Sequence, residues 1–156
     1  MHTVELLLDP QLERHVRELW DRLHDAGLPS LATHRHRSNR PHLTVITAAT
    51  LTGVPSIPLP LPVELGPVRF LGRALIRSVT PSTALDDLHG SCWSALRDAD
   101  PWPDPQHWVP HVSLALKVDP EHQVAALALL AAEPPARGTF VAARSYDSRT
   151  RTATDL

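Results

Sequence analysis

The alternation of apolar and polar positions divides the chain into short elements. Residues 4–8 form an apolar run that predicts a strand. A helix should begin at Asp9-Pro10, because Asp is a good N-cap and Pro suits the first helical position. Gly27 offers a stop for this helix. Its inner face recurs at helical spacing as Leu12, Val16, Leu19, Trp20 and Leu23.

The rest of the chain continues the pattern. Two more helices are predicted to start at Pro81-Ser82 and Asp119-Pro120. Residues 53–67 contain five prolines, which argues against both a helix and a central strand, so we expect an extended connector there. The polar tail after Ser148 is expected to be loose. Further strands are predicted at residues 43–46, 68–71, 74–79, 109–118 and 139–143.

One order of elements occurs twice: a strand, a proline-initiated helix, a loop, and a strand that opens with Pro-His-x-Thr or Pro-His-x-Ser. This duplication predicts a single α+β domain over residues 1–156, with two pseudosymmetric lobes at about 1–52 and 68–148. The Pro-rich residues 53–67 would connect them. We expect mostly antiparallel sheets to line a central cleft, with the helices outside.

The two repeated strands carry polar pairs. Residues i and i+2 of a strand point to the same side, so His42 shares a face with Thr44, and His111 shares one with Ser113. The apolar residues between them should face the helices. Matching positions of two related lobes would bring two imidazoles and two hydroxyls together across the cleft.

Composition limits the partners. Hydrophobic residues make up 42% of the chain and charged residues 21%, which suits a domain with a buried core. The net charge of −2 argues against binding long duplex nucleic acid, which needs a basic face. Cys92 is the only cysteine, so no intrachain disulfide can form. With no leader or membrane-span pattern, we expect a cytoplasmic monomer away from membranes.

A pair of imidazoles beside two hydroxyls suits phosphoryl chemistry without a metal or other cofactor. Histidine has an ordinary pKa near 6.5, so one neutral and one protonated ring can coexist near neutral pH. One His would activate a water or hydroxyl, and the other would protonate the leaving oxygen. The hydroxyls would donate hydrogen bonds to phosphate oxygens. Either His42 or His111 can take either role.

The stretches RPHLTVI and VPHVSLAL resemble the paired H-x-T/S motifs of the 2H phosphoesterase superfamily, in particular the bacterial 2′-5′ RNA ligase-like proteins. The resemblance implies a bilobal α+β fold that opens 2′,3′-cyclic phosphates or cuts 2′-5′ phosphodiesters of nucleotides or RNA ends. It also implies a 2′-phosphate product and reverse 2′-5′ RNA ligation. Carried over, it makes His42 and His111 the catalytic acid/base pair, and Thr44 and Ser113 the phosphate-binding hydroxyls.

Two neighbours of the motifs are further substrate-binding candidates. Arg40 is the closest arginine to the first motif and would attract phosphate, while Trp108 precedes the second motif and would stack a base. Two alternatives stay open. One is a non-catalytic module that binds a nucleotide or RNA end. The other is a metal-dependent hydrolase whose ligands come from the His-rich loop with His34 and His36.

Overall fold

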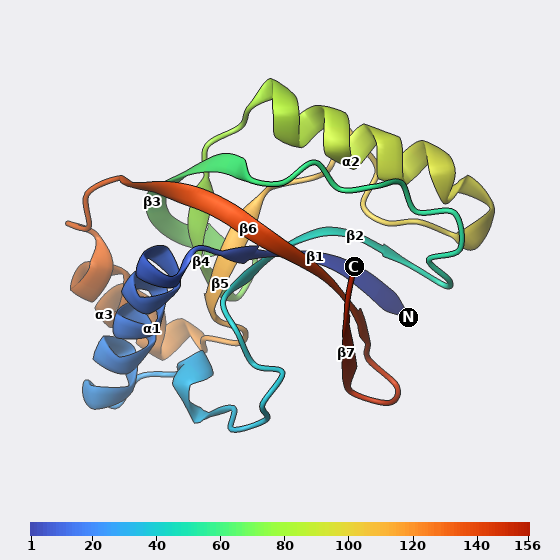
Figure 1. Cartoon of the computed structure of the whole chain (residues 1–156). Coiled ribbons are helices and arrows are strands. Elements are labelled where there is room, and N and C mark those ends of the chain that lie inside the picture. The colour runs from blue at the N-terminus through green and yellow to red at the C-terminus, as the bar shows by residue number, and fades with distance from the viewer.

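The computed structural model describes the whole chain, Met1–Leu156, and has the predicted α+β fold with a single antiparallel sheet (Figure 1). None of its helices is both long and apolar enough to cross a membrane. The helices are α1 (Pro10–Asp25), α2 (Thr83–Ala95) and α3 (Pro120–Leu130), with short 3-10 turns at Leu31–Thr33 and Arg97–Ala99. The strands are β1 (His2–Leu8), β2 (His42–Ala48), β3 (Leu61–Leu71), β4 (Ala74–Val79), β5 (His111–Ala115), β6 (Ala136–Asp147) and β7 (Thr152–Asp155).

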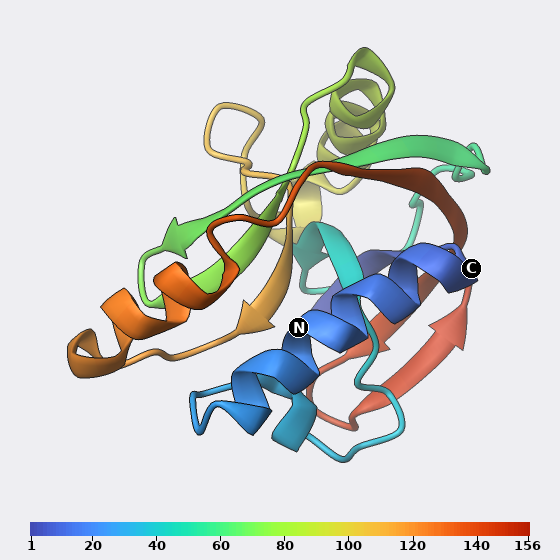
Figure 2. The ribbon, with the colours of Figure 1, turned by 90° about the vertical axis from the view of Figure 1, so that its left-hand side faces the viewer.

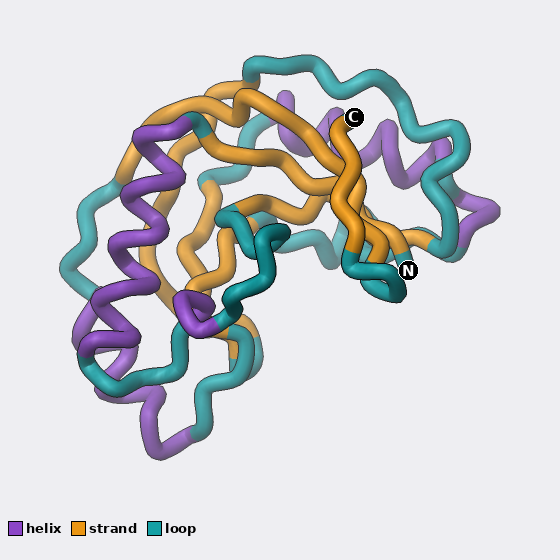
Figure 3. The backbone as a smooth tube through the Cα atoms, turned by 60° about the horizontal axis from the view of Figure 1, so that its bottom comes forward, coloured by secondary structure: helices purple, strands orange, loops and turns teal.

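The seven strands follow the order β1-β2-β5-β4-β3-β6-β7, and β1 also pairs with β6. The long strand β6 contacts β3 through its first half and β1 through its second half, with Phe140 as the point of change. Six strands therefore close on themselves, and Figure 3 shows their curved course. Helices α1 and α3 lie side by side on one side, and α2 lies on another (Figures 1 and 2).

Helix α1 begins at the predicted cap. Oδ1 of Asp9 accepts the N–H of Leu12 at 2.8 Å, and Oδ2 accepts the N–H of Thr139 on β6, also at 2.8 Å. Burial raises the pKa of Asp9, but these backbone donors lower it more, so the carboxylate form is favoured. Gly138 leaves room for this contact, because a Cβ there would collide with the Asp9 carboxylate. The cap thus joins α1 to the sheet.

Two expectations about the connecting segments are wrong. Residues 53–67 form a connector only up to Pro60, because β3 starts at Leu61 and includes two prolines. Pro62 lies where β3 pairs with β6 on one side only, and Pro67 lies in the bulge between Leu65 and Val68. A residue without an N–H is tolerated at both kinds of position. The tail after Ser148 is not loose but returns as β7, paired with β6.

Candidate functional site

The structure brings the four motif residues together on one face of the sheet. Strands β2 and β5 are antiparallel with Leu43 opposite Val112, a register that sets His42 opposite Ser113 and Thr44 opposite His111. Opposed Cβ atoms lie about 5 Å apart, and diagonal neighbours about 7–8 Å apart. The two imidazoles therefore occupy diagonal corners of a square. Leu43 and Val112 are fully buried on the opposite face, as the alternation requires.

Both imidazoles are held in the same way. Nδ1 of His42 lies 2.7 Å from the carbonyl oxygen of Arg40, and Nδ1 of His111 lies 2.7 Å from the carbonyl oxygen of Val109. A carbonyl only accepts, so Nδ1 carries the proton and Nε2 is left for chemistry. The proline before each histidine explains the match, because it restricts the preceding residue to an extended conformation that aims its carbonyl at the ring.

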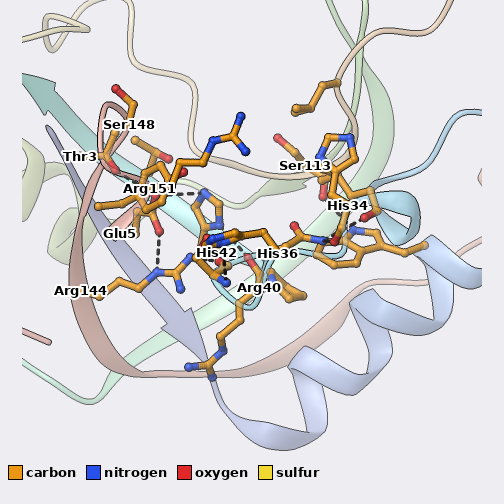
Figure 4. A pocket seen from close by; sticks show the side chains of 18 of the residues that line it. Thr3, Glu5, His34, His36, Arg40, His42, Ser113, Arg144, Ser148 and Arg151 are labelled. Atoms are coloured by element: carbon orange, nitrogen blue, oxygen red, sulfur yellow. Dashed lines mark hydrogen bonds and ion pairs between the residues drawn. The ribbon is translucent and has the colours of Figure 1, made fainter. Parts of the chain in front are cut away.

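A pocket of about 680 Å³ opens beside this square. In Figure 4 the His42 ring lies in its middle, with Glu5 and Arg144 on one side and Ser113 on the other. Glu5 is the only acidic residue of the lining, so the pocket is strongly basic although the chain has a net charge of −2. Such a field attracts phosphate. Its basic residues are Arg35, Arg40, Arg144 and Arg151, together with the imidazoles of His34, His36 and His42.

A buried ion pair supports the His42 side of the square. The Glu5 carboxylate accepts hydrogen bonds from Nε of Arg144 at 2.7 Å and from the Thr3 hydroxyl at 2.9 Å, and it lies 3.6 Å from Nε2 of His42. Arg144 also donates to the carbonyl oxygen of Ser38 at 2.7 Å. Glu5 is 3% exposed and Arg144 is 5% exposed. The pair links β1 and β6 to the loop before β2.

The surroundings of His111 are different. It lies opposite Ser78 of β4, whose hydroxyl accepts a hydrogen bond from Arg69 at 3.0 Å. Burial lowers the pKa of His111, as do the positive charges of His42 and Arg69, and these effects outweigh its hydrogen bond to Val109. The ring is thus biased towards its neutral form. His111 does not line the large pocket but adjoins it through Thr44.

The other two predicted residues have partners within the protein. Arg40 lines the pocket, and its Nε donates to Glu13 of α1 at 2.9 Å. Trp108 is absent from the lining: its ring stacks on His89 with centroids 4.4 Å apart, and its N–H donates to the carbonyl oxygen of Thr44 at 3.2 Å. The packing favours a supporting role for Trp108 in place of base stacking.

The loop histidines do not assemble a metal site. Only Asp119, Glu121 and His122 have three ligand atoms within 4.8 Å of one another, and they lie at the start of α3, away from the motifs. His34 and His36 line the pocket without forming such a group. The ligand set assumed by the metal-dependent alternative is therefore not present in this geometry.

Several pocket residues were not predicted. Glu5 is the one acidic residue inside the apolar run VELLL. A charge in such a run could have indicated a buried carboxylate with a partner or a role, because an unpaired buried charge is costly. Arg144 and Tyr146 lie on β6, where Arg144 pairs with Glu5 and Tyr146 pairs with Thr3 of β1. No feature of the sequence indicated that Arg151 lines the pocket, because its position depends on the turn between β6 and β7, where it has a φ of 56°.

Comparison with known protein families assigns the chain to a class. A family model for the 2′-5′ RNA ligase superfamily matches residues 47–147, about two-thirds of the chain, and the chain belongs to this superfamily of 2H phosphoesterases. This confirms the predicted family. The matched span includes His111 and Ser113 but begins after His42 and Thr44.

Solved structures agree at the level of the fold. The MHV ns2 PDE domain has a TM-score of 0.57 and 15% identity, over 99% of this chain and 97% of that one. Usb1 of Kluyveromyces marxianus has a TM-score of 0.52 and 12% identity, over 99% of this chain and 96% of that one. No curated protein matches the chain by sequence.

Proposed function

We propose that this chain hydrolyses a 2′,3′-cyclic phosphate or a 2′-5′ phosphodiester at a nucleotide or RNA end, with two histidines and no metal. One observation supports this most strongly: His42 and His111 lie at diagonal corners of a square, each with Nδ1 held by a backbone carbonyl and Nε2 without a hydrogen bond. A phosphate placed between them meets the hydroxyls of Thr44 and Ser113 at the other corners. The basic pocket favours the same ligand.

We assign the base to His111 and the acid to His42. The lowered pKa of His111 keeps its ring neutral near pH 7, which a base requires. The Glu5 carboxylate lies 3.6 Å from Nε2 of His42 and offers an opposite charge to an imidazolium there. In the square, the two rings then approach the phosphorus from opposite sides.

The proposed step balances in protons and bonds. Nε2 of His111 takes a proton from water while the water oxygen forms a bond to phosphorus. The bond from phosphorus to the 3′-oxygen breaks, and Nε2–H of His42 protonates that oxygen, so the product is a 2′-phosphate, as the family resemblance implies. The Thr44 and Ser113 hydroxyls donate to the phosphate oxygens, where charge increases. With a 5′-hydroxyl in place of water as the nucleophile, the same proton transfers would form a bond from the 5′-oxygen to phosphorus and release the 3′-hydroxyl, which gives a 2′-5′ linkage.

The test is direct. The purified chain is mixed with each of the four nucleoside 2′,3′-cyclic phosphates in excess EDTA, and products are followed by ³¹P NMR. We expect conversion to nucleoside 2′-monophosphates that EDTA leaves unchanged. Binding of the cyclic nucleotide without product would favour the non-catalytic module. Activity that EDTA abolishes and added metal restores would favour the metal-dependent hydrolase.

A further inference from the structure

A second basic groove lies next to the pocket. It has a volume of about 560 Å³ and is formed by α1 and the loop that precedes β2. The two cavities share a wall, so a ligand in one can continue into the other. The shared residues are Trp20, His34, Arg35, His36 and Asn39, and the second groove adds Arg17, Asp21, Ala32 and Arg37.

The arginines of this groove have no acidic partners. Arg17, Arg35 and Arg37 form no ion pair within 4.0 Å, whereas Arg40 and Arg144 of the first pocket each pair with a glutamate. All three are exposed. Unpaired guanidinium groups beside one another repel, and an anionic ligand would relieve that repulsion. Their planar donors match phosphate oxygens.

The loop that carries these arginines is held in place by internal hydrogen bonds. The Asn39 amide donates to the carbonyl oxygens of Leu31 at 2.9 Å and His34 at 2.8 Å. The Ser30 hydroxyl donates to the carbonyl oxygen of Trp20 at 2.6 Å and accepts the N–H of Ala32 at 3.1 Å. The groove is therefore a built feature and not the side of a loose loop.

The charge of the groove suits a phosphate chain. Its one indole ring, Trp20, is 3% exposed and lies under Arg17 at 5.5 Å, so the face of that ring is covered. The Trp20 N–H donates to the carbonyl oxygen of Ser113 at 3.1 Å, which ties the groove to the corner of the square next to the scissile phosphate. Recognition here would depend on charge and would be independent of base sequence.

We infer that this second groove binds the next backbone phosphate of an RNA strand whose terminal phosphate lies in the first pocket. The inference rests on the proposed function and narrows it: the substrates are oligonucleotide ends, and free mononucleotides bind weakly. A strand running from the His42–His111 square past His34 would reach Arg17 and Arg37. Each phosphate contact also adds to the salt dependence of binding.

Calorimetric titration of a ligand series tests this in EDTA and low salt. The ligands are a nucleoside 3′-monophosphate, a nucleoside 3′,5′-bisphosphate, and a trinucleotide with a 3′-phosphate. We expect the trinucleotide to bind at least about tenfold tighter than the monophosphate, since hydrogen bonds to charged groups are strong. Its log–log salt slope should be steeper by about 0.7 for each added phosphate contact.

Variants locate the effect. Arg17→Ala and Arg37→Ala should each reduce the ratio of trinucleotide to monophosphate affinity, and the double variant should bring it close to one. Arg97→Ala, which removes an exposed arginine elsewhere, should leave the ratio unchanged. Equal affinities across the series in the wild-type protein, or a ratio that survives in the double variant, would overturn the second site.

The same series separates the two proposals. The bisphosphate carries both the terminal phosphate and the next one, so it should also bind tighter than the monophosphate. If only the trinucleotide binds tighter, the groove does not take the next phosphate and the inference is wrong. If the affinities follow the expected order but no cyclic phosphate is hydrolysed, the groove stands and the proposed hydrolysis fails. If mononucleotide and trinucleotide cyclic phosphates are hydrolysed with equal kcat/KM and the affinities are equal, the proposed hydrolysis stands and the second groove fails.

Discussion

Glu5→Gln is the change whose consequence follows most directly from the structure. The Glu5 carboxylate binds Nε of Arg144 at 2.7 Å and the Thr3 hydroxyl at 2.9 Å. Both members of the ion pair are almost completely buried, with side chains 4% and 6% exposed. The amide keeps the shape of the side chain, but it is neutral and one of its two acceptor atoms becomes a donor. The substitution leaves the Arg144 charge buried without an anion.

The expected cost is set by burial. Removing one partner of a buried ion pair costs about 3–5 kcal/mol, because the remaining charge is uncompensated. We expect the lower end, about 3 kcal/mol, since the amide oxygen can still accept one hydrogen bond. The carbonyl oxygen of Ser38 also remains as an acceptor for Arg144. At roughly 2–4 °C per kcal/mol for a chain of this size, the melting temperature should fall by roughly 6–12 °C.

Urea unfolding at pH 7, supported by thermal melts, measures this change. The chain offers a matched control in Glu64→Gln, because Glu64 binds the same two groups: Nε of Arg137 at 3.0 Å and the Thr80 hydroxyl at 2.9 Å. That pair is exposed, with Arg137 85% accessible, so the control should melt close to the wild type. If Glu5→Gln is no more destabilising than Glu64→Gln, the claimed role of burial is wrong.

Three further predictions test other parts of the structure. Asp9→Ala should lower the free energy of unfolding at pH 7 by about 1 kcal/mol, measured in urea, because the helix cap is lost. Since the pKa of Asp9 is lowered in the folded protein, this advantage of the wild type should disappear as the pH falls through the folded-state pKa. An unchanged urea midpoint at pH 7 contradicts the cap. Burial raises the pKa of Cys92 to about 11, so its thiol should react with a thiol reagent at pH 8 only after unfolding, and rapid reaction of the native protein contradicts this. Arg69→Ala should raise the pKa of His111 in an NMR titration, since a like charge is removed, and an unchanged or lower pKa refutes the stated cause.

The elements that the sequence predicted well depend on local chemistry. Helices α1 and α3 begin at the predicted Asp-Pro pairs, because proline geometry acts within one turn. Asp9 also caps α1 with its side chain, whereas Asp119 makes no cap hydrogen bond to α3. The shared face of each motif pair follows from the two-residue period of a strand. The internal repeat predicted that the two motifs face each other across a cleft between lobes. The structure brings them together differently, on neighbouring strands of one sheet with His42 diagonal to His111.

The parts that were missed depend on pairing between distant segments. Glu5 and Arg144 meet only because β1 pairs with β6, and nothing near either residue specifies that pairing. Arg151 reaches the pocket through a hairpin that the polar tail did not indicate. Five prolines argued against a strand in residues 53–67, yet the effect of each proline depends on which edge of the strand it faces. Local sequence does not carry that information.

The central claim is that two histidines act as one unit on a single phosphorus atom, and turnover by His42→Ala, His111→Ala and the double variant tests it most directly. The substrate is an RNA trinucleotide ending in a 2′,3′-cyclic phosphate, in EDTA. Each single variant should lose at least about a hundredfold in kcat, and the double variant should lose little more than the worse single variant. Wild-type turnover in either single variant would contradict the account.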